Sequence, residues 1–160
     1  GEGKIFYNAM PVAGTIARDD MFPYTLPNDT TGYAQSASVK NPLDSLSATN
    51  MKEAERLFLV NCAICHGPKL DGNGPLWKDG TGPFPAAPKN LLSDEIKAKA
   101  DGTIFHVMTY GKGQMGSYAG QVNPKQRWMI VKYIRSVQGG GGKVSSDSTA
   151  VKKDSTAKAK

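Results

Sequence analysis

The chain has 160 residues, a formal net charge of +6, and only two cysteines and two histidines. This length allows one compact core with additions. No apolar run approaches the roughly 20 residues that cross a bilayer, so we expect no membrane span. The opening GEGKIF is neither basic nor apolar enough for a signal sequence, and we expect any leader to have been removed.

The positive charge is unevenly distributed along the chain. Residues 1–50 carry three basic and five acidic side chains, residues 51–138 carry twelve and seven, and residues 139–160 carry five and two. The lysines are scattered among acids without a basic stripe interleaved with aromatic residues, so we expect no nucleic-acid partner. The charge is better suited to steering the surface toward an acidic protein or an anionic lipid.

Residues 1–50 predict an extended N-terminal arm. This region is rich in Pro, Thr, Asn and Gly, and aromatic residues such as Phe6, Tyr24 and Tyr33 follow neither helical nor strand periodicity. Disordered segments are poor in aromatic residues. We therefore expect the arm to lie along a surface, either that of its own domain or that of a partner.

Residues 51–138 predict an all-α domain with helices joined by glycine and proline loops. The segments NMKEAERLFLVNC, DGTIFHVMTYG and NPKQRWMIVKYIRSVQGG each combine a capping residue with helical apolar spacing. A short helix opening at Ser93 is also expected, because two acidic residues follow it. The expected helix starts are Asn50, Asp101 and Asn123 (with Pro124 at the first helical position), and the expected stops are Gly111 and Gly139.

Two stretches lack regular signals. Residues 67–92 form too long a loop for a compact domain unless a cofactor fills the space beside it. Residues 139–160, GGGGKVSSDSTAVKKDSTAKAK, are of low complexity and predict a disordered, flexible C-terminal tail.

Cys62, Cys65 and His66 form the pattern C-x-x-C-H, which is typical of covalent c-type haem attachment. Two thiols three residues apart at the end of a helix can reach the two vinyl groups on one side of a porphyrin. The next residue then projects its imidazole to the iron. One pentapeptide therefore predicts a single haem c, covalently bound through both cysteines, with His66 as the proximal ligand.

Three other interpretations compete with haem. A thioredoxin-like redox pair requires a strand before the motif, whereas a helix is expected here. A zinc site could use both cysteines with His66 and His106, but four-ligand zinc sites usually come as two spaced pairs. A disulfide between Cys62 and Cys65 would be strained and would close almost no loop.

The distal iron ligand is expected among the methionines and His106. Met115 lies in YGKGQMGSYAGQ, a glycine-rich loop in which the backbone can approach a porphyrin closely. Met108 and Met129 fall at helical core spacing and are expected to pack in the interior. Met115 is the favoured ligand, and His106 is the alternative. Tyr118, Tyr110 and Trp77 are further candidates for the wall of the haem crevice.

The motif C-x-x-C-H, the loop G-x-M-x-x-Y and the final aromatic helix together resemble a class I cytochrome c. The resemblance implies that the helix before the motif crosses the last helix near perpendicularly. It places Ala54 and Phe58 at this contact, with Trp128 or Tyr133 on the other side. It also implies that the carbonyl of a loop proline, here matched to Pro75, accepts a hydrogen bond from His66.

The haem domain and the stretches PVAGTIARDDMFPY and KNPL are also similar to the mono-haem cytochrome c subunit of alternative complex III, a bacterial quinol-oxidising respiratory assembly. This resemblance implies an electron-transfer subunit that is not itself an enzyme and that docks on partner subunits through residues 1–50. Its implied partners are a multihaem cytochrome c, an iron–sulfur protein, and a terminal oxidase or soluble carrier as acceptor.

The same resemblance implies a place on the periplasmic face of the bacterial cytoplasmic membrane. That subunit is typically a lipoprotein, whereas this chain has no spare cysteine, so any lipid anchor would lie upstream of Gly1. The alternative function is a free or oxidase-associated cytochrome c. A peroxidase or dehydrogenase subunit would need an open iron site or a catalytic cluster, and the sequence offers neither.

Overall fold

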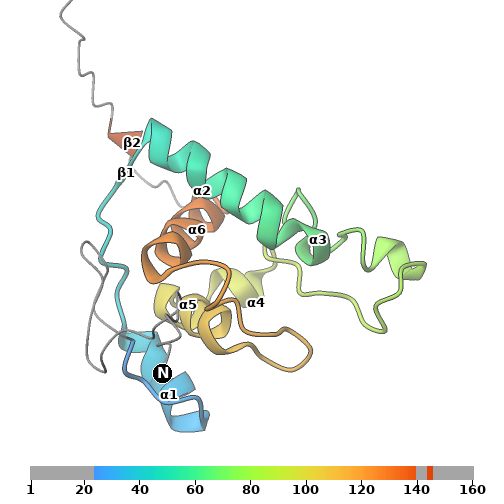
Figure 1. Ribbon diagram of the computed structural model, residues 1–160, viewed down its shortest axis with the longest axis horizontal. Helices are drawn as coiled ribbons and strands as arrows, with labels where there is room; N and C mark the ends of the chain where they lie inside the picture. The colour runs from blue at the N-terminus through green and yellow to red at the C-terminus, as the bar shows by residue number, and fades with distance from the viewer. Residues whose placement is uncertain (1–23, 140–143, 146–160) are drawn as a thin grey trace, which may run out of the picture.

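The computed structural model describes residues 24–139 and 144–145, which form a helical domain with one small sheet (Figure 1). The α-helices are α1 Thr30–Gln35, α2 Ala48–Asn61, α3 Ala63–His66, α4 Asp94–Lys97, α5 Asp101–Tyr110 and α6 Pro124–Val137. Two 3-10 helices, Ser36–Ser38 and Lys78–Gly80, lie between them. Strands β1 Leu46–Ser47 and β2 Val144–Ser145 pair in parallel, with Leu46 opposite Val144.

The crossing of α2 and α6 forms the centre of the core (Figure 1). Ala54 and Phe58 of α2 are both fully buried, and the ring of Phe58 lies 5.4 Å from that of Tyr133 in α6. The expected contact residues of α2 are therefore confirmed, and of the two candidates on α6 it is Tyr133 that meets them. Trp128 instead stacks on Phe105 of α5, with ring centroids 4.1 Å apart and an interplanar angle of 13°. Trp128 therefore joins α6 to α5.

The observed helix starts agree only in part with the starts predicted from the sequence. Asn123 caps α6, as predicted, and it also forms a reciprocal capping box with Gln126. The expected cap at Asn50 is wrong: the Ser47 side chain accepts a hydrogen bond from the Asn50 N–H at 3.2 Å, so α2 begins three residues earlier than expected. Asp101 is the first residue of α5 rather than its cap.

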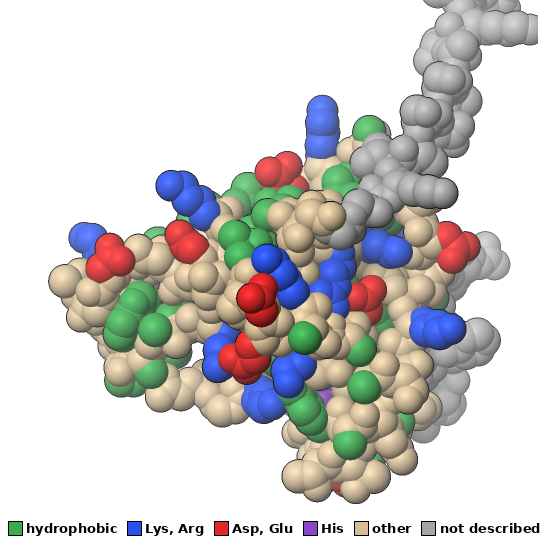
Figure 2. Space-filling model, turned by 180° about the vertical axis from the view of Figure 1, so that it is seen from behind, with side chains coloured by type: hydrophobic (Ala, Val, Ile, Leu, Met, Phe, Trp, Pro, Cys, Tyr) green, Lys and Arg blue, Asp and Glu red, His purple; other side chains and the backbone are tan. Residues whose placement is uncertain are grey.

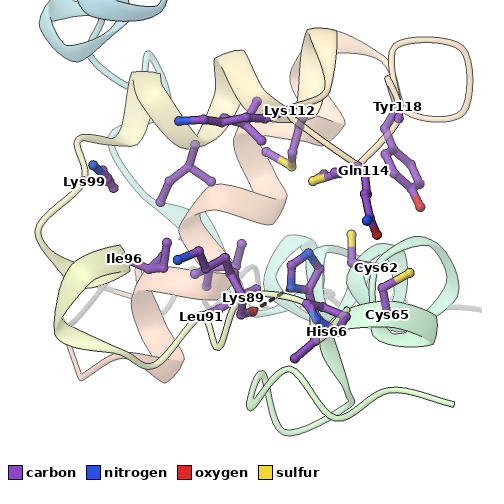
Figure 3. A pocket seen from close by; sticks show the side chains of 18 of the residues that line it. Cys62, Cys65, His66, Lys89, Leu91, Ile96, Lys99, Lys112, Gln114 and Tyr118 are labelled. Carbon is purple, nitrogen blue, oxygen red and sulfur yellow. Dashed lines mark hydrogen bonds between the residues drawn. The ribbon is translucent and has the colours of Figure 1, made fainter. Parts of the chain in front are cut away.

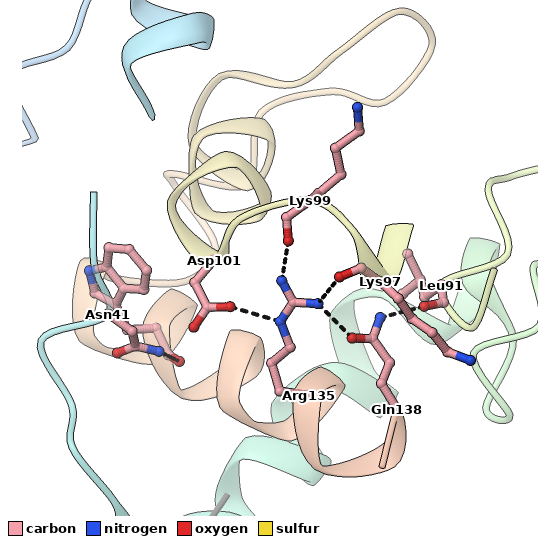
Figure 4. A network of polar contacts seen from close by, with 8 residues as sticks. Asn41, Leu91, Lys97, Lys99, Asp101, Arg135 and Gln138 are labelled. Atoms are coloured by element: carbon pink, nitrogen blue, oxygen red, sulfur yellow. Dashed lines mark hydrogen bonds and ion pairs between the residues drawn. The ribbon is translucent and has the colours of Figure 1, made fainter. Parts of the chain in front are cut away.

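Arg135 connects the end of α6 to the chain that leads into α5 (Figure 4). Its guanidinium donates to Asp101 at 2.7 Å, to the carbonyl of Lys97 at 3.1 Å and to that of Lys99. Gln138 accepts a further bond from Arg135 and donates to the carbonyl of Leu91. One half-buried cation thus holds the segment 91–101 in place, and this segment forms part of the wall of the site described below.

The described part of the predicted arm, residues 24–50, is helical only near its start and lies on the domain. Residues 24–38, called the N-terminal segment from here on, contain α1 and pack on α5. The Ser36 hydroxyl donates to Thr103 at 3.3 Å, and a side chain at Gly102 would collide with the carbonyl of Ser36. Local glycine and proline content predicted an irregular chain, but close packing against α5 folds it into a helical turn.

Other predictions about the ends of the chain lie outside the described residues. Residues 1–23 carry nearly half of the arm, and residues 140–143 and 146–160 carry most of the tail. In the described part of the chain, no helix is long and apolar enough to cross a bilayer. Figure 2 shows one face of the molecule, on which basic and acidic side chains are interleaved.

Candidate haem-binding site

The C-x-x-C-H motif lies at the junction of α2 and α3. Cys62 ends α2, and its carbonyl accepts hydrogen bonds from the N–H groups of Cys65 at 3.2 Å and His66 at 2.9 Å. The single turn of α3 ends at Gly67, whose φ of +75° favours glycine. The loop that follows returns directly over this turn. It passes so close that a side chain at Gly74 would collide with the carbonyls of Ala63, Ile64 and Cys65.

The imidazole of His66 is oriented by a backbone carbonyl. Its Nδ1 lies 2.9 Å from the carbonyl oxygen of Lys89 (Figure 3). A carbonyl only accepts hydrogen bonds, so Nδ1 carries the proton and Nε2 is left with a free lone pair. Burial lowers the pKa of His66, which favours the neutral form that ligates a metal.

The surroundings of the two thiols disfavour their thiolate forms. Both are free, and burial, together with the neighbouring Cys65, raises the pKa of Cys62 to about 12. Burial also raises the pKa of Cys65. Reactive cysteines of redox enzymes show the opposite shift. The environment of this pair therefore argues against a thioredoxin-like function.

The motif faces a cavity of about 720 Å³. This volume is within the range of sites that hold small molecules and cofactors. Most of its lining is apolar, and it draws on α2, the loop 67–92, α4, α5 and the loop before α6. The long loop predicted to need a cofactor beside it supplies one wall, through residues that include Leu76, Phe84 and Pro88.

The loop between α5 and α6 closes the opposite side of the cavity. Residues 111–118, called the Met115 loop from here on, begin at Gly111, whose φ is +83°. A side chain at Gly111 would collide with the Met115 carbonyl, so this position requires glycine. Met115 and Tyr118 both line the cavity. Figure 3 shows Gln114 and Tyr118 of this loop across the cavity from Cys62, Cys65 and His66.

The residues present fit a covalently bound haem. Two thiols and an imidazole with a free nitrogen lie on one wall, and a thioether lies among the residues of another wall. An apolar interior between them suits a porphyrin, and His with Met is an established pair of iron ligands. In the part of the chain that the structure describes, no group of three or more His, Cys, Asp and Glu side chains could hold a metal ion, which disfavours the zinc interpretation.

The structure places four other candidate residues outside the lining of the cavity: Pro75, Trp77, His106 and Tyr110. Pro75 is exposed and does not line the cavity, and the carbonyl at His66 belongs to Lys89, so the prediction for Pro75 is corrected. Trp77 does not line the cavity either. His106 is buried under the N-terminal segment, with its Nδ1 3.1 Å from the Tyr24 hydroxyl. Tyr110 accompanies it there, and neither residue lines the cavity.

Sequence reasoning missed Lys89, which follows Pro88 and orients His66. A backbone carbonyl has no side-chain signature, and several prolines follow the haem motif within residues 67–92. It also missed Tyr33, which lines the cavity from α1. Tyr33 precedes the haem motif by almost 30 residues, and no local pattern connects the two.

A family model described as "Cytochrome C oxidase, cbb3-type, subunit III" matches residues 49–134, more than half of the chain. No curated protein matches the sequence. Among solved structures, the chain is similar to one in the reducing HAO-like protein complex of Kuenenia stuttgartiensis, with 21% identity and a TM-score of 0.49. That match covers 62% of this chain and 49% of the other.

Proposed function

The chain belongs to the family of cytochrome c domains typified by subunit III of cbb3-type oxidases, and from this membership we propose how its residues hold one haem c and what they do with it. Membership makes the chain an electron-transfer protein rather than a catalytic enzyme, and it implies haem c as the cofactor. The helical domain fits the class I cytochrome c fold. The number of haems, their attachment, the ligands and the partners are our proposals.

Cys62 and Cys65 would hold the haem, each adding its S–H bond across one of the two vinyl groups. Each addition forms one C–S and one C–H bond, so no separate oxidant or reductant is needed. His66 is the proximal ligand through Nε2, because Nδ1 is already bonded to Lys89. Met115 is the distal ligand. The observation that carries this proposal is the cavity with the C-x-x-C-H motif on one side and the Met115 loop on the other.

When bound, haem iron supplies one-electron oxidation and reduction. With His66 and Met115 as its ligands, the iron would have no position left for a substrate, so the function would be outer-sphere electron transfer. The thioether of Met115 favours a higher potential than a second imidazole would. The apolar lining keeps water from the site, and the Lys89 carbonyl keeps the His66 ring in one orientation.

We propose that the chain works as the mono-haem cytochrome subunit of alternative complex III. The support is the similarity of the N-terminal and haem-domain sequences to that subunit. Electrons would come from quinol through an iron–sulfur protein and a multihaem cytochrome c, and would leave to a terminal oxidase or a soluble carrier. The chain would lie on the periplasmic face of the cytoplasmic membrane, held there by the complex or by an anchor upstream of Gly1.

A second candidate is an oxidase-associated or free cytochrome c. The name of the matched family favours it, because that name refers to an oxidase subunit. Both candidates share the haem chemistry and differ in the proteins that surround the chain.

Capture of the tagged chain from gently solubilised host membranes separates the two candidates. We expect recovery with a multihaem cytochrome, an iron–sulfur protein and polytopic membrane subunits, identified by haem staining and peptide mass spectrometry. Recovery with oxidase subunits, or of the chain alone, would reject the alternative complex III assignment and leave the haem site untouched.

A further inference from the structure

The two ends of the Met115 loop are held by different parts of the chain. At the C-terminal end, the Tyr118 N–H donates to the Met108 carbonyl at 2.9 Å and the Ser117 hydroxyl donates to Thr109 at 2.6 Å. These partners belong to α5. At the N-terminal end, Lys112 and Met115 exchange two backbone hydrogen bonds of 2.9 and 3.1 Å across an exposed turn. This turn needs support from elsewhere to keep its place over the cavity.

The N-terminal segment provides that support. The Lys112 ammonium lies 3.8 Å from the centre of the Tyr33 ring, which is a cation–π contact. Directly before the loop, the Tyr110 hydroxyl donates to the carbonyl of Leu26 at 2.7 Å. The segment is itself fixed to α5, because Tyr24 packs edge-on against Phe105 with ring centroids 5.0 Å apart. The N-terminal segment therefore contacts the loop from a rigid base.

These contacts lie directly behind the proposed ligand. A second, more open hollow is lined by Tyr33, His106, Tyr110, Lys112 and Met115, and three of these residues (Tyr33, Lys112 and Met115) also line the haem cavity. Met115 is thus located between the cavity and a hollow that the N-terminal segment borders. Because Lys112 is bonded to Met115 in both directions, a shift of Lys112 moves the backbone that carries the thioether.

We infer that the N-terminal segment clamps the Met115 loop over the cavity, with Tyr33 and Lys112 as positioning residues. The N-terminal segment lies outside residues 49–134, the part that the family model matches, whereas the Met115 loop lies within it. The inference rests on the proposed function only in taking Met115 as the iron ligand. Loosening the clamp should let the thioether leave the iron more often.

The test uses the full chain loaded with haem and the variants Lys112→Met, Tyr33→Leu and their combination. The first readout is amide hydrogen exchange of peptides from the Met115 loop, which is measured without using the iron as the probe. The second is the rate at which imidazole binds the oxidised haem, followed by absorption, together with the midpoint potential. Lys125→Met, at an exposed lysine in the first turn of α6, is the matched control.

Lys112→Met should raise both the exchange rate and the imidazole-binding rate about two- to fivefold, the range expected for one exposed cation–π contact. The double variant should add little to either single one, and Lys112→Arg should restore wild-type behaviour, because a guanidinium also binds an aromatic face. Faster exchange without faster imidazole binding would support the clamp and reject Met115 as ligand. Exchange equal to that of the wild type and of Lys125→Met would overturn the clamp.

Discussion

At the scale of single residues, the two proposed iron ligands are held in contrasting ways. His66 follows a helical turn and is oriented by a hydrogen bond of 2.9 Å to Lys89. Met115 lies in a glycine-rich loop whose tip is exposed. The imidazole should therefore remain on the iron under conditions that release the thioether, and Met115 is the ligand to test by mutation.

Met115→Ala should lower the midpoint potential by on the order of 0.1 V or more, because axial ligands set haem potentials over a range of about 0.8 V. It should also allow cyanide or imidazole to bind the iron quickly. A redox titration and absorption spectra provide the measurement. Met108→Leu is the matched control, since Met108 also lines the cavity but is buried in α5. An unchanged potential and spectrum in Met115→Ala would refute the distal ligand, and loss of thioether ligation in Met108→Leu would transfer that role to Met108.

At the scale of elements, the site depends on long-range contacts that fix short segments. Arg135 of α6 holds the chain between α4 and α5 through two carbonyls and the Asp101 carboxylate. These segments contribute Ile96, Lys99 and Ile104 to the cavity wall. Stability and cavity shape are therefore linked through one side chain.

Arg135→Met should reduce the free energy of unfolding by about 2–3 kcal/mol, the range for hydrogen bonds to a charged group that is partly removed from water. Chemical denaturation of the haem-loaded protein, followed by far-UV circular dichroism, measures this. Arg56→Met removes an exposed ion pair with Glu53 and should change stability little. Equal effects of the two substitutions would contradict the structural role given to Arg135.

The elements also show why sequence reasoning succeeded in some places and failed in others. The cap at Asn123 and the haem motif are local patterns, each formed by residues within one or two helical turns, so the sequence alone predicts them. The Lys89 carbonyl and the burial of His106 are not local. Every residue has a backbone carbonyl, so the residue type does not mark the one that orients His66. The sequence likewise does not show that the N-terminal segment covers His106.

At the scale of the whole molecule, the region before the family domain has two parts with different expected functions. Residues 24–38 pack on α5 and belong structurally to the haem domain. Residues 1–23 lie outside the described residues and carry nearly all of PVAGTIARDDMFPY, one of the stretches that are similar to the alternative complex III subunit. We propose that docking on partner subunits belongs to residues 1–23.

Deletion of residues 1–23 should therefore leave the spectrum and thermal midpoint of the haem domain unchanged while abolishing capture of the complex. Deletion of residues 1–40 should also lower the thermal midpoint, because it removes the contacts of Tyr24, Tyr33 and Ser36 with α5 and the Met115 loop. Capture from solubilised membranes and thermal denaturation monitor the two effects. Continued capture of the complex by the shorter deletion would refute a docking role for residues 1–23.

The most direct test of the whole account is the intact mass of the denatured chain, purified from cells that mature c-type cytochromes. We predict the mass of the polypeptide plus one haem, retained under denaturing conditions because both bonds to Cys62 and Cys65 are covalent. The variant with both cysteines replaced by alanine should have the mass of the polypeptide alone. A wild-type chain without added haem, or haem retained by the double variant, would contradict the central claim.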